Sequence, residues 1–249
     1  MNIYNIEGSN KMSSLHNKKI GLLLPYRTEQ SLIDFVNTNL TLNSDLVFRG
    51  AQDGKTDDEL RELSQGIAPN SYAENLADGS TVFITRETVV AGMKANAQAL
   101  LDDGCDAVMV CCSLPWPELE QMKNVVTPCT ILKCSVMNLV ARGAVVGILQ
   151  PIKEAMADEI IHWQAFGKKH NLTITAQFAA PQVPGEDNMS SSDDIIQAVQ
   201  ALLAQNAQLI VLDCMAYTEA HRSLIAQVSG LPVLRAMSLT GTIINQAFG

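Results

Sequence analysis

Two cysteines, Cys112 and Cys214, stand where predicted buried strands end. Cys112 closes the apolar stretch DAVMVCC that begins at Asp106, and Cys214 follows the stretch LIVLD after Gln208. Each cysteine lies six residues beyond the polar residue that begins its strand, so the two thiols share one register. Because open α/β proteins bind ligands at the carboxyl ends of parallel strands, this placement predicts two thiols beside one binding site.

Two facing thiols suit proton transfer at carbon. A thiolate can remove a proton from a carbon next to a carboxylate or carbonyl, and a thiol on the opposite face can return one. A helix that begins after each cysteine would favour the thiolate through its positive end. Cys112 and Cys214 therefore predict a racemase, epimerase or isomerase that needs no cofactor and acts on a small anionic substrate, such as an amino acid or a derivative.

The other cysteines have a simpler explanation, because free cysteine is often a small buried hydrophobe. We predict that role for Cys105, Cys129 and Cys134, and we expect Cys111 to point to the opposite face of its strand from Cys112. The same explanation stays open for the matched pair. Two alternatives follow: an inactive protein that binds or senses a small molecule, or a lyase or decarboxylase that uses one thiol.

Two arginines near predicted strand ends are candidates for binding a substrate carboxylate. Arg27 follows the first predicted strand, and its planar guanidinium matches a carboxylate; the alternative is a solvated loop arginine. Arg49 ends the second predicted strand, and its alternative is a structural pair with Asp53.

Three residues next to the cysteines are further candidates for substrate binding. Ser113 could offer its hydroxyl and backbone N–H to an anion at a helix start, or could simply cap that helix. Asp213 could orient a ligand or an acid-base partner, but its charge could also make the neighbouring thiol a poor base. Tyr217 could line the pocket or pack within the turn that follows Cys214.

The composition excludes several classes of function. The chain has 249 residues, 47% of them hydrophobic, and a formal charge of −9 without a basic patch, so nucleic acid is not an expected partner. No apolar run is long enough for a membrane span, and the N-terminal stretch lacks a signal-like apolar core, so we expect a cytoplasmic protein. The six cysteines form no C-x-x-C pair and the four histidines are scattered, so no metal site is predicted. No nucleotide motif is present either, and we expect no cofactor.

Strands and helices alternate along the chain, which predicts an α/β fold with parallel sheets flanked by helices. The two halves share one plan, which predicts two pseudo-symmetric lobes. We expect a loose extension at 1–17, a first lobe at 18–125, a second lobe at 126–235, and a closing helix at 236–249 that packs back on the first lobe. Between the lobes the pattern predicts a helix at 118–123, a strand at 125–132 and a helix at 134–142.

Three segments resemble the AroM family, which is grouped with the aspartate/glutamate racemase superfamily. They are RGAQDG at 49–54, DDELREL at 57–63 and VLDCMAYTEAHR at 211–222, and the resemblance extends over about 19–247. It implies an aspartate/glutamate racemase-like fold of two lobes. A homodimer is also possible by analogy with the family.

The resemblance also implies roles for the two cysteines. Superfamily racemases carry one cysteine in a C-N-T-type motif and one in a G-C-T-H-type motif, and by strand register these match Cys112 and Cys214. This chain departs from those motifs. Ser113 and Leu114 occupy the positions of Asn and Thr in the first motif. In the second motif, Asp213 occupies the position of Gly, and Met-Ala replaces Thr-His. Tyr-Arg also replaces the D-S-G-type loop after the first strand.

Overall fold

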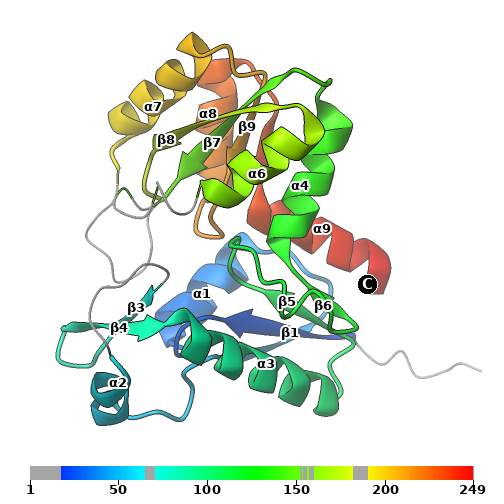
Figure 1. The fold of residues 1–249 in the computed structure, drawn as a ribbon. Coiled ribbons are helices and arrows are strands. Elements are labelled where there is room, and N and C mark those ends of the chain that lie inside the picture. The colour runs from blue at the N-terminus through cyan, green and yellow to red at the C-terminus, as the bar shows by residue number, and fades with distance from the viewer. Residues whose placement is uncertain are drawn as a thin grey trace, which may run out of the picture.

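A computed structural model describes residues 18–64, 71–151, 153, 156, 160–181 and 190–248. The predicted extension at 1–17 lies outside these residues. The described chain forms two lobes, one above the other in Figure 1, and each has its own parallel sheet flanked by helices. The predicted α/β fold with two lobes is therefore confirmed.

The first lobe is built on a four-stranded parallel sheet of order β2-β1-β5-β6. Strand β1 lies second in the order and is almost wholly buried, as expected for an apolar strand covered on both faces. A hairpin, β3-β4, adds a separate two-stranded sheet as predicted. The elements are β1 (Lys19–Leu24), α1 (Gln30–Asn39), β2 (Asp45–Gly50), α2 (Asp57–Leu63), β3 (Ser71–Asn75), β4 (Thr81–Thr85), α3 (Arg86–Asp102), β5 (Ala107–Val110) and β6 (Val125–Val126).

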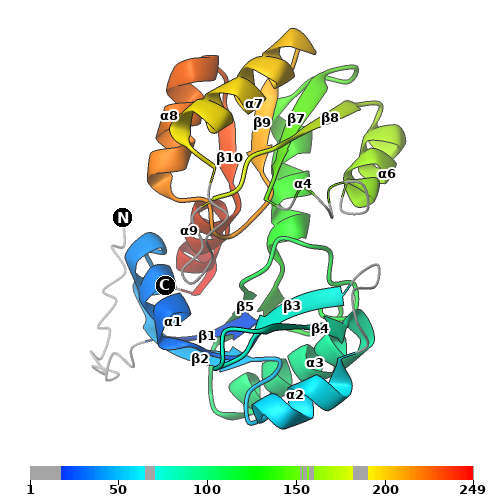
Figure 2. The same cartoon turned by 90° about the vertical axis from the view of Figure 1, so that its left-hand side faces the viewer.

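The second lobe contains a four-stranded parallel sheet of order β10-β9-β7-β8. Figure 2 shows α7 and α8 on one side of this sheet, with α6 and α4 on the other. The elements from the lobe junction onward are α4 (Pro128–Leu139), β7 (Val145–Gln150), α6 (Ile161–His170), β8 (Thr173–Phe178), α7 (Ser192–Ala204), β9 (Leu209–Leu212), α8 (Glu219–Ser229), β10 (Val233–Arg235) and α9 (Ala236–Phe248).

The two sheets have the same topology. If the strands of each sheet are numbered in chain order, both sheets read 2-1-3-4. In each sheet the order reverses between the first and third strands, which are β1 and β5 in one lobe and β7 and β9 in the other. Such reversal points are where doubly wound folds bind ligands, just beyond the carboxyl ends of the strands.

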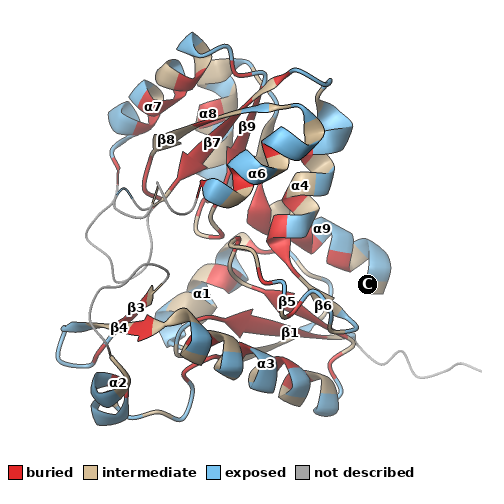
Figure 3. Ribbon diagram, viewed as in Figure 1, coloured by how far each residue is buried: buried red, intermediate tan, exposed pale blue. Residues whose placement is uncertain are grey.

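One apolar core joins the lobes, and Figure 3 shows its buried strands in red. This core contains Ile20 and Met109 from the first sheet together with Ile148 and Val211 from the second. Each lobe also has a core cluster of its own. Because apolar side chains of both sheets share one core, their burial stabilises the contact between the lobes.

The closing helix α9 contacts the first lobe through polar and apolar groups. The Asn245 amide donates a hydrogen bond to the carbonyl of Thr41 and accepts one from the backbone of Asn43. Gly241 lies so close to Leu40 that a Cβ there would be 2.7 Å from its side chain. The boundary predicted between residues 125 and 126 stays a prediction.

The junction between the lobes differs from the sequence prediction. Residues 117–122 form turns and not a helix, and the predicted strand at 125–132 shrinks to the two residues of β6. Helix α4 replaces the rest of that strand because Pro128 occupies its first turn, where a missing N–H costs nothing. The shift of α4 also leaves Cys134 exposed, so its predicted burial is wrong.

Candidate functional site

The two candidate cysteines occupy equivalent positions in the two sheets. Cys112 lies two residues after Val110, the end of β5, and Cys214 lies two residues after Leu212, the end of β9. Both strands are the third of their sheet in chain order. Both thiols are half-buried. The sequence register therefore corresponds to a structural equivalence at the ligand-binding edge of each sheet.

Neighbouring cysteines of the first lobe face opposite ways, as predicted. Cys111 packs against the core between the lobes, whereas Cys112 packs against the cluster beneath α3. Burial raises the pKa of Cys111 to about 12, which keeps it a neutral thiol. Burial also raises the pKa of Cys129 to about 11 and shifts Cys105 in the same direction. The predicted burial of these last two cysteines is confirmed.

Asp213, the residue before Cys214, is a buried carboxyl at the reversal point of the second sheet. Its Oδ2 accepts hydrogen bonds from Gln150 Nε2 at 3.0 Å and Trp163 Nε1 at 2.7 Å. Burial nevertheless raises the pKa of Asp213 to about 6, because removal from water disfavours the charged form more than the donors favour it. A carboxyl in this state titrates just below neutral pH.

Two other polar side chains surround Asp213. His162 Nε2 lies 3.7 Å from its Oδ2, but burial lowers the pKa of His162 to about 3, so this contact is no ion pair at neutral pH. The Lys133 ammonium lies 5.7 Å from the centre of the Trp163 ring, and its charge favours the ionised carboxyl. The cluster therefore holds one acid, a neutral imidazole and a cation.

Ser113 of the first lobe lies near enough to the Asp213 carboxyl to lower its pKa. No hydrogen bond of ordinary length joins the two side chains, and Asp213 Oδ1 has no hydrogen-bond partner among the described residues. Ser113 follows Cys112 directly and Asp213 precedes Cys214, so this proximity places the two cysteine loops near each other.

The expected helix start differs between the two cysteines. No helix follows Cys112 before α4 begins at Pro128, so Ser113 neither lies at a helix start nor caps a helix, and that part of its prediction is wrong. After Cys214 a turn leads to α8, which is capped by Thr218. The backbone N–H of Ala216 donates to Cys214 Sγ at 3.4 Å. Among the described residues, a helix therefore begins soon after Cys214 but not soon after Cys112.

Arg27 is held by the first lobe's own acids. Its guanidinium contacts Asp57 at 2.6 Å and Glu74 at 3.1 Å, and it donates to the carbonyl of Asn75 at 2.7 Å. Glu74 is buried, so the positive charge of Arg27 offsets the cost of removing the Glu74 carboxylate from water. The predicted binding of a substrate carboxylate by Arg27 stays a prediction. Such binding would require the substrate to replace one of these three partners.

Arg49 pairs with Asp103 at 2.6 Å, not with Asp53 as the structural alternative proposed. Asp53 instead accepts hydrogen bonds from the backbone N–H groups of Thr28 and Gly50. Gly50 is required there, because a Cβ would lie 2.0 Å from the carbonyl of Tyr26. The RGAQDG segment thus anchors the loop after β1, and substrate binding by Arg49 stays untested.

Tyr217 is completely buried in the turn before α8. Its hydroxyl donates to the carbonyl of Ala179, and its ring meets His221 edge to face. The Arg235 guanidinium donates to its backbone carbonyl at 3.1 Å. Tyr217 therefore connects the turn after Cys214 to the end of β8, and its predicted place in a substrate pocket stays a prediction.

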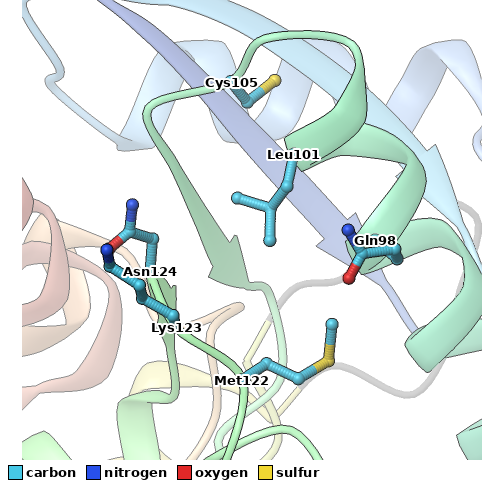
Figure 4. Close-up of a pocket in the computed structure, with 6 residues that line it drawn as sticks. All are labelled: Gln98, Leu101, Cys105, Met122, Lys123 and Asn124. Carbon is cyan, nitrogen blue, oxygen red and sulfur yellow. The ribbon is translucent and has the colours of Figure 1, made fainter.

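A cavity of about 370 Å³ lies in the first lobe. Figure 4 shows the residues that line it. Cys105 and Asn124, which line it, precede β5 and β6, so this cavity lies at the amino ends of the strands, away from Cys112. Among the residues described, no group of three or more His, Cys, Asp or Glu side chains is arranged to bind a metal ion. No helix within the described ranges has the length and apolar character needed to cross a bilayer.

Three partners of Asp213 were not predicted from the sequence as site residues: Gln150, Trp163 and His162. Gln150 had a usable signal, because it is a polar residue at the end of an apolar strand, just as Asp213 is. Trp163 and His162 had none, since they lie within an ordinary amphipathic helix.

Fold and site together define a two-lobed α/β protein with a thiol at the same strand end of each lobe. A family model described as AroM protein matches residues 13–248, and the chain belongs to this family. The comparison with curated proteins gave no match.

Solved structures with the same fold are aspartate/glutamate racemase-like proteins. Glutamate racemase from Francisella tularensis subsp. tularensis SCHU S4, in complex with D-glutamate, is 15% identical, with 92% of this chain and 80% of that chain covered and a TM-score of 0.56. Allantoin racemase from Klebsiella pneumoniae is 14% identical, with 92% and 86% covered and a TM-score of 0.58. Arylmalonate decarboxylase is 14% identical, with 92% and 93% covered and a TM-score of 0.60.

Proposed function

We propose that this protein is a cofactor-independent enzyme that moves a proton on and off a carbon next to a carboxylate or carbonyl group. Cys112 and Cys214 act as the acid-base pair: one thiolate removes the proton, and the other thiol donates its own proton to the opposite face of the carbon. The observation that carries this proposal is the equivalent position of the two thiols, two residues beyond the third strand of each sheet.

Two further observations support the pair. Ser113, next to Cys112, lies near enough to Asp213, next to Cys214, to lower the pKa of that carboxyl, which supports loops that lie near each other. Both candidate thiols are half-buried, whereas Cys111 and Cys129 have pKa values raised to about 12 and about 11. The named activities of the structural relatives, glutamate racemase and allantoin racemase, agree with this reaction class.

A single-thiol reaction is the second candidate, and one observation favours it. Cys214 is followed closely by helix α8, and its sulfur accepts a hydrogen bond from the backbone N–H of Ala216. In such a reaction the bond between the substrate carbon and its carboxylate breaks and CO₂ leaves. The electron pair that remains on the carbon then takes the proton of Cys214, and solvent returns a proton to the sulfur. One structural relative is named arylmalonate decarboxylase.

Solvent exchange tests the proposal directly. The protein is incubated in heavy water with 2-amino acids, 2-hydroxy acids, hydantoins and malonates, and the substrate protons are followed by NMR. We expect one class to lose its α-proton signal in the presence of the protein. Cys134→Ala, which removes an exposed cysteine on α4, is the matched control and should keep the full rate.

Each other outcome identifies a different function. Loss of CO₂ from a malonate, dependent on Cys214 and not on Cys112, would replace the two-thiol reaction by the single-thiol one. An absence of exchange across the panel, combined with a compound that raises the melting temperature, would contradict catalysis and identify a binding protein.

A further inference from the structure

In the first lobe, Arg86 holds the irregular turn that follows Cys112. Arg86 begins α3, and its guanidinium donates to the carbonyl of Pro115 at 3.2 Å and to the carboxylate of Glu118 at 3.0 Å. It also lies over the ring of Trp116, 4.9 Å from the ring centre. Since Pro115 is the third residue after Cys112, a cation of α3 fixes the backbone close to this thiol.

In the second lobe, Arg235 holds the turn that follows Cys214. Arg235 ends β10 and is buried. Its guanidinium donates to the carbonyl of Tyr217 at 3.1 Å, and its Nε lies 3.8 Å from the carboxylate of Glu219. Its Nη2 donates to the carbonyl of Asn39 in the first lobe at 3.2 Å. Arg235 therefore ties the turn after Cys214 both to its own sheet and to the other lobe.

The two arginines make equivalent contacts although they come from different elements. In Figure 2, α3 lies in the lower lobe and β10 in the upper one. In both lobes the carbonyl that accepts the hydrogen bond belongs to the third residue after the cysteine, and an acid shortly beyond it lies near the same guanidinium. Each turn also contains a fully buried aromatic side chain, Trp116 in one and Tyr217 in the other. This recurrence associates each arginine with a thiol turn and not with the packing of one lobe.

A guanidinium suits this position because its planar fork donates in several directions at once. Pro115 and Tyr217 lie outside helices and strands, so their carbonyls have no place in a regular hydrogen-bond ladder and a side-chain donor can satisfy them. A charged donor makes a stronger hydrogen bond than a neutral one, so each turn should open less often. Glu118 and Glu219 are both partly exposed, so water can solvate each carboxylate if its arginine is replaced.

We propose that Arg86 and Arg235 are positioning residues, each of which fixes the turn after one cysteine and so holds that thiol in place for proton transfer. This inference rests on the proposed function in one respect, since it takes Cys112 and Cys214 as the reacting thiols. It goes further by assigning one arginine to each thiol: Arg86 to Cys112, and Arg235 to Cys214.

Alkylation by iodoacetamide tests this assignment without any substrate. The rate at each cysteine is read by mass spectrometry of the modified peptides. Both thiols are half-buried, so a turn that opens more often exposes its own thiol to the reagent more often. In Arg86→Met we expect Cys112 to react about tenfold faster while Cys214 keeps its rate. In Arg235→Met we expect Cys214 to react about tenfold faster while Cys112 keeps its rate.

Two control variants separate this role from general effects of charge and of contact between the lobes. Arg222→Met removes a cation that pairs with Glu219 within α8, and it should leave both thiol rates unchanged. Asn245→Ala removes hydrogen bonds between the lobes, to Thr41 and Asn43, and it should also leave both rates unchanged.

Lysine variants keep the charge of each arginine and change only the geometry of its donors. A lysine cannot reproduce the planar fork, so Arg86→Lys and Arg235→Lys should each accelerate the same thiol as the methionine variant, by a smaller factor. These variants carry the test if a methionine variant fails to fold.

The proposal is overturned if the thiol assigned to a replaced arginine does not react faster than in the unchanged protein, or if both thiols change alike in one folded variant. With a substrate whose proton exchanges, each methionine variant should lose about 10²-fold in kcat and keep its KM, because a displaced thiol slows the reaction without weakening binding. An unchanged kcat in either variant would also overturn the proposal. Absence of exchange in the unchanged protein would instead overturn the proposed function, because the thiol rates are measured without substrate.

Discussion

Two buried carboxyls dominate the chemistry of single residues in this protein, and each is stabilised differently. Asp213 has two neutral donors at one oxygen, from Gln150 and Trp163, whereas Glu74 has the guanidinium and backbone N–H of Arg27. Burial raises the pKa of both acids. Such groups are costly to bury, so each is expected to have a measurable effect on stability.

Asp213 should reduce stability as the pH rises. Its pKa of about 6 in the folded chain is above the ordinary carboxyl value, so its favourable contribution is complete below about pH 4 and is lost as the pH rises through 6. Asp213→Asn lacks this titration. Its free energy of unfolding relative to the unchanged protein should therefore increase by about 2 kcal/mol between pH 4 and pH 7. Urea unfolding at both pH values measures this difference, and a constant difference would contradict the raised pKa.

Replacement of Arg27 should lower the stability of the folded protein. Arg27→Ala leaves the buried Glu74 without its cation and should lower the free energy of unfolding by roughly 3 kcal/mol. Glu74→Gln in the same chain removes the stranded charge and should restore most of the loss. A double variant that is stable but inactive in solvent exchange would support the predicted contact between Arg27 and a substrate carboxylate, whereas a stable and active one would exclude it.

At the scale of elements, the RGAQDG segment explains how α3 is fixed beneath the first sheet. The carbonyl of Gly50 accepts a hydrogen bond from the Asn96 amide of α3 at 2.9 Å. Gly92 on the same helix lies so close to Ala51 that a Cβ would be 2.1 Å from its carbonyl oxygen. This contact sets how closely α3 packs on the sheet that ends in Cys112.

Gly92→Ala should therefore destabilise the first lobe although alanine is the better helix former. The added methyl group cannot fit without displacing α3 from the backbone of Ala51, which should cost about 3 kcal/mol. Lys94→Ala, an exposed change two residues further along the helix, is the control and should stay within about 0.5 kcal/mol. A stable Gly92→Ala protein, measured by urea unfolding, would show that the close contact is not needed.

The sequence predicted the elements wherever an apolar run and its breaker agreed, as in β1, β9 and the β3-β4 hairpin. It failed at 125–132, because VVTPCTIL is apolar without a clear period and its proline suits a helix start as well as a strand end. The cysteine positions followed from strand register. The partners of Asp213 did not, since Gln150 and Trp163 are 63 and 50 residues away in the chain and only tertiary packing joins them.

At the scale of the whole molecule, the shared core predicts that the two lobes unfold together. The cluster between them contains β1 and β5 residues as well as β7 and β9 residues, so separating the lobes would expose part of the core of each. The chain has one tryptophan in each lobe, Trp116 and Trp163. These residues allow each lobe to be observed separately.

We expect a single urea transition from both lobes. In Trp116→Phe the fluorescence reports the second lobe, and in Trp163→Phe it reports the first. Within each variant the fluorescence transition should coincide with that seen by far-ultraviolet circular dichroism. Two separate midpoints within one variant would mean that the lobes are independently stable domains.

The joined lobes matter because the proposed reaction needs one thiol from each of them. The most direct test is the rate of α-proton exchange, with whichever substrate the heavy-water panel identifies, in Cys112→Ala, Cys214→Ala and the control Cys134→Ala. We predict that each of the first two variants loses about 10²–10⁴-fold in rate, the usual contribution of an acid or base, while the control keeps its rate. Full exchange in either Cys112→Ala or Cys214→Ala would contradict a two-thiol mechanism.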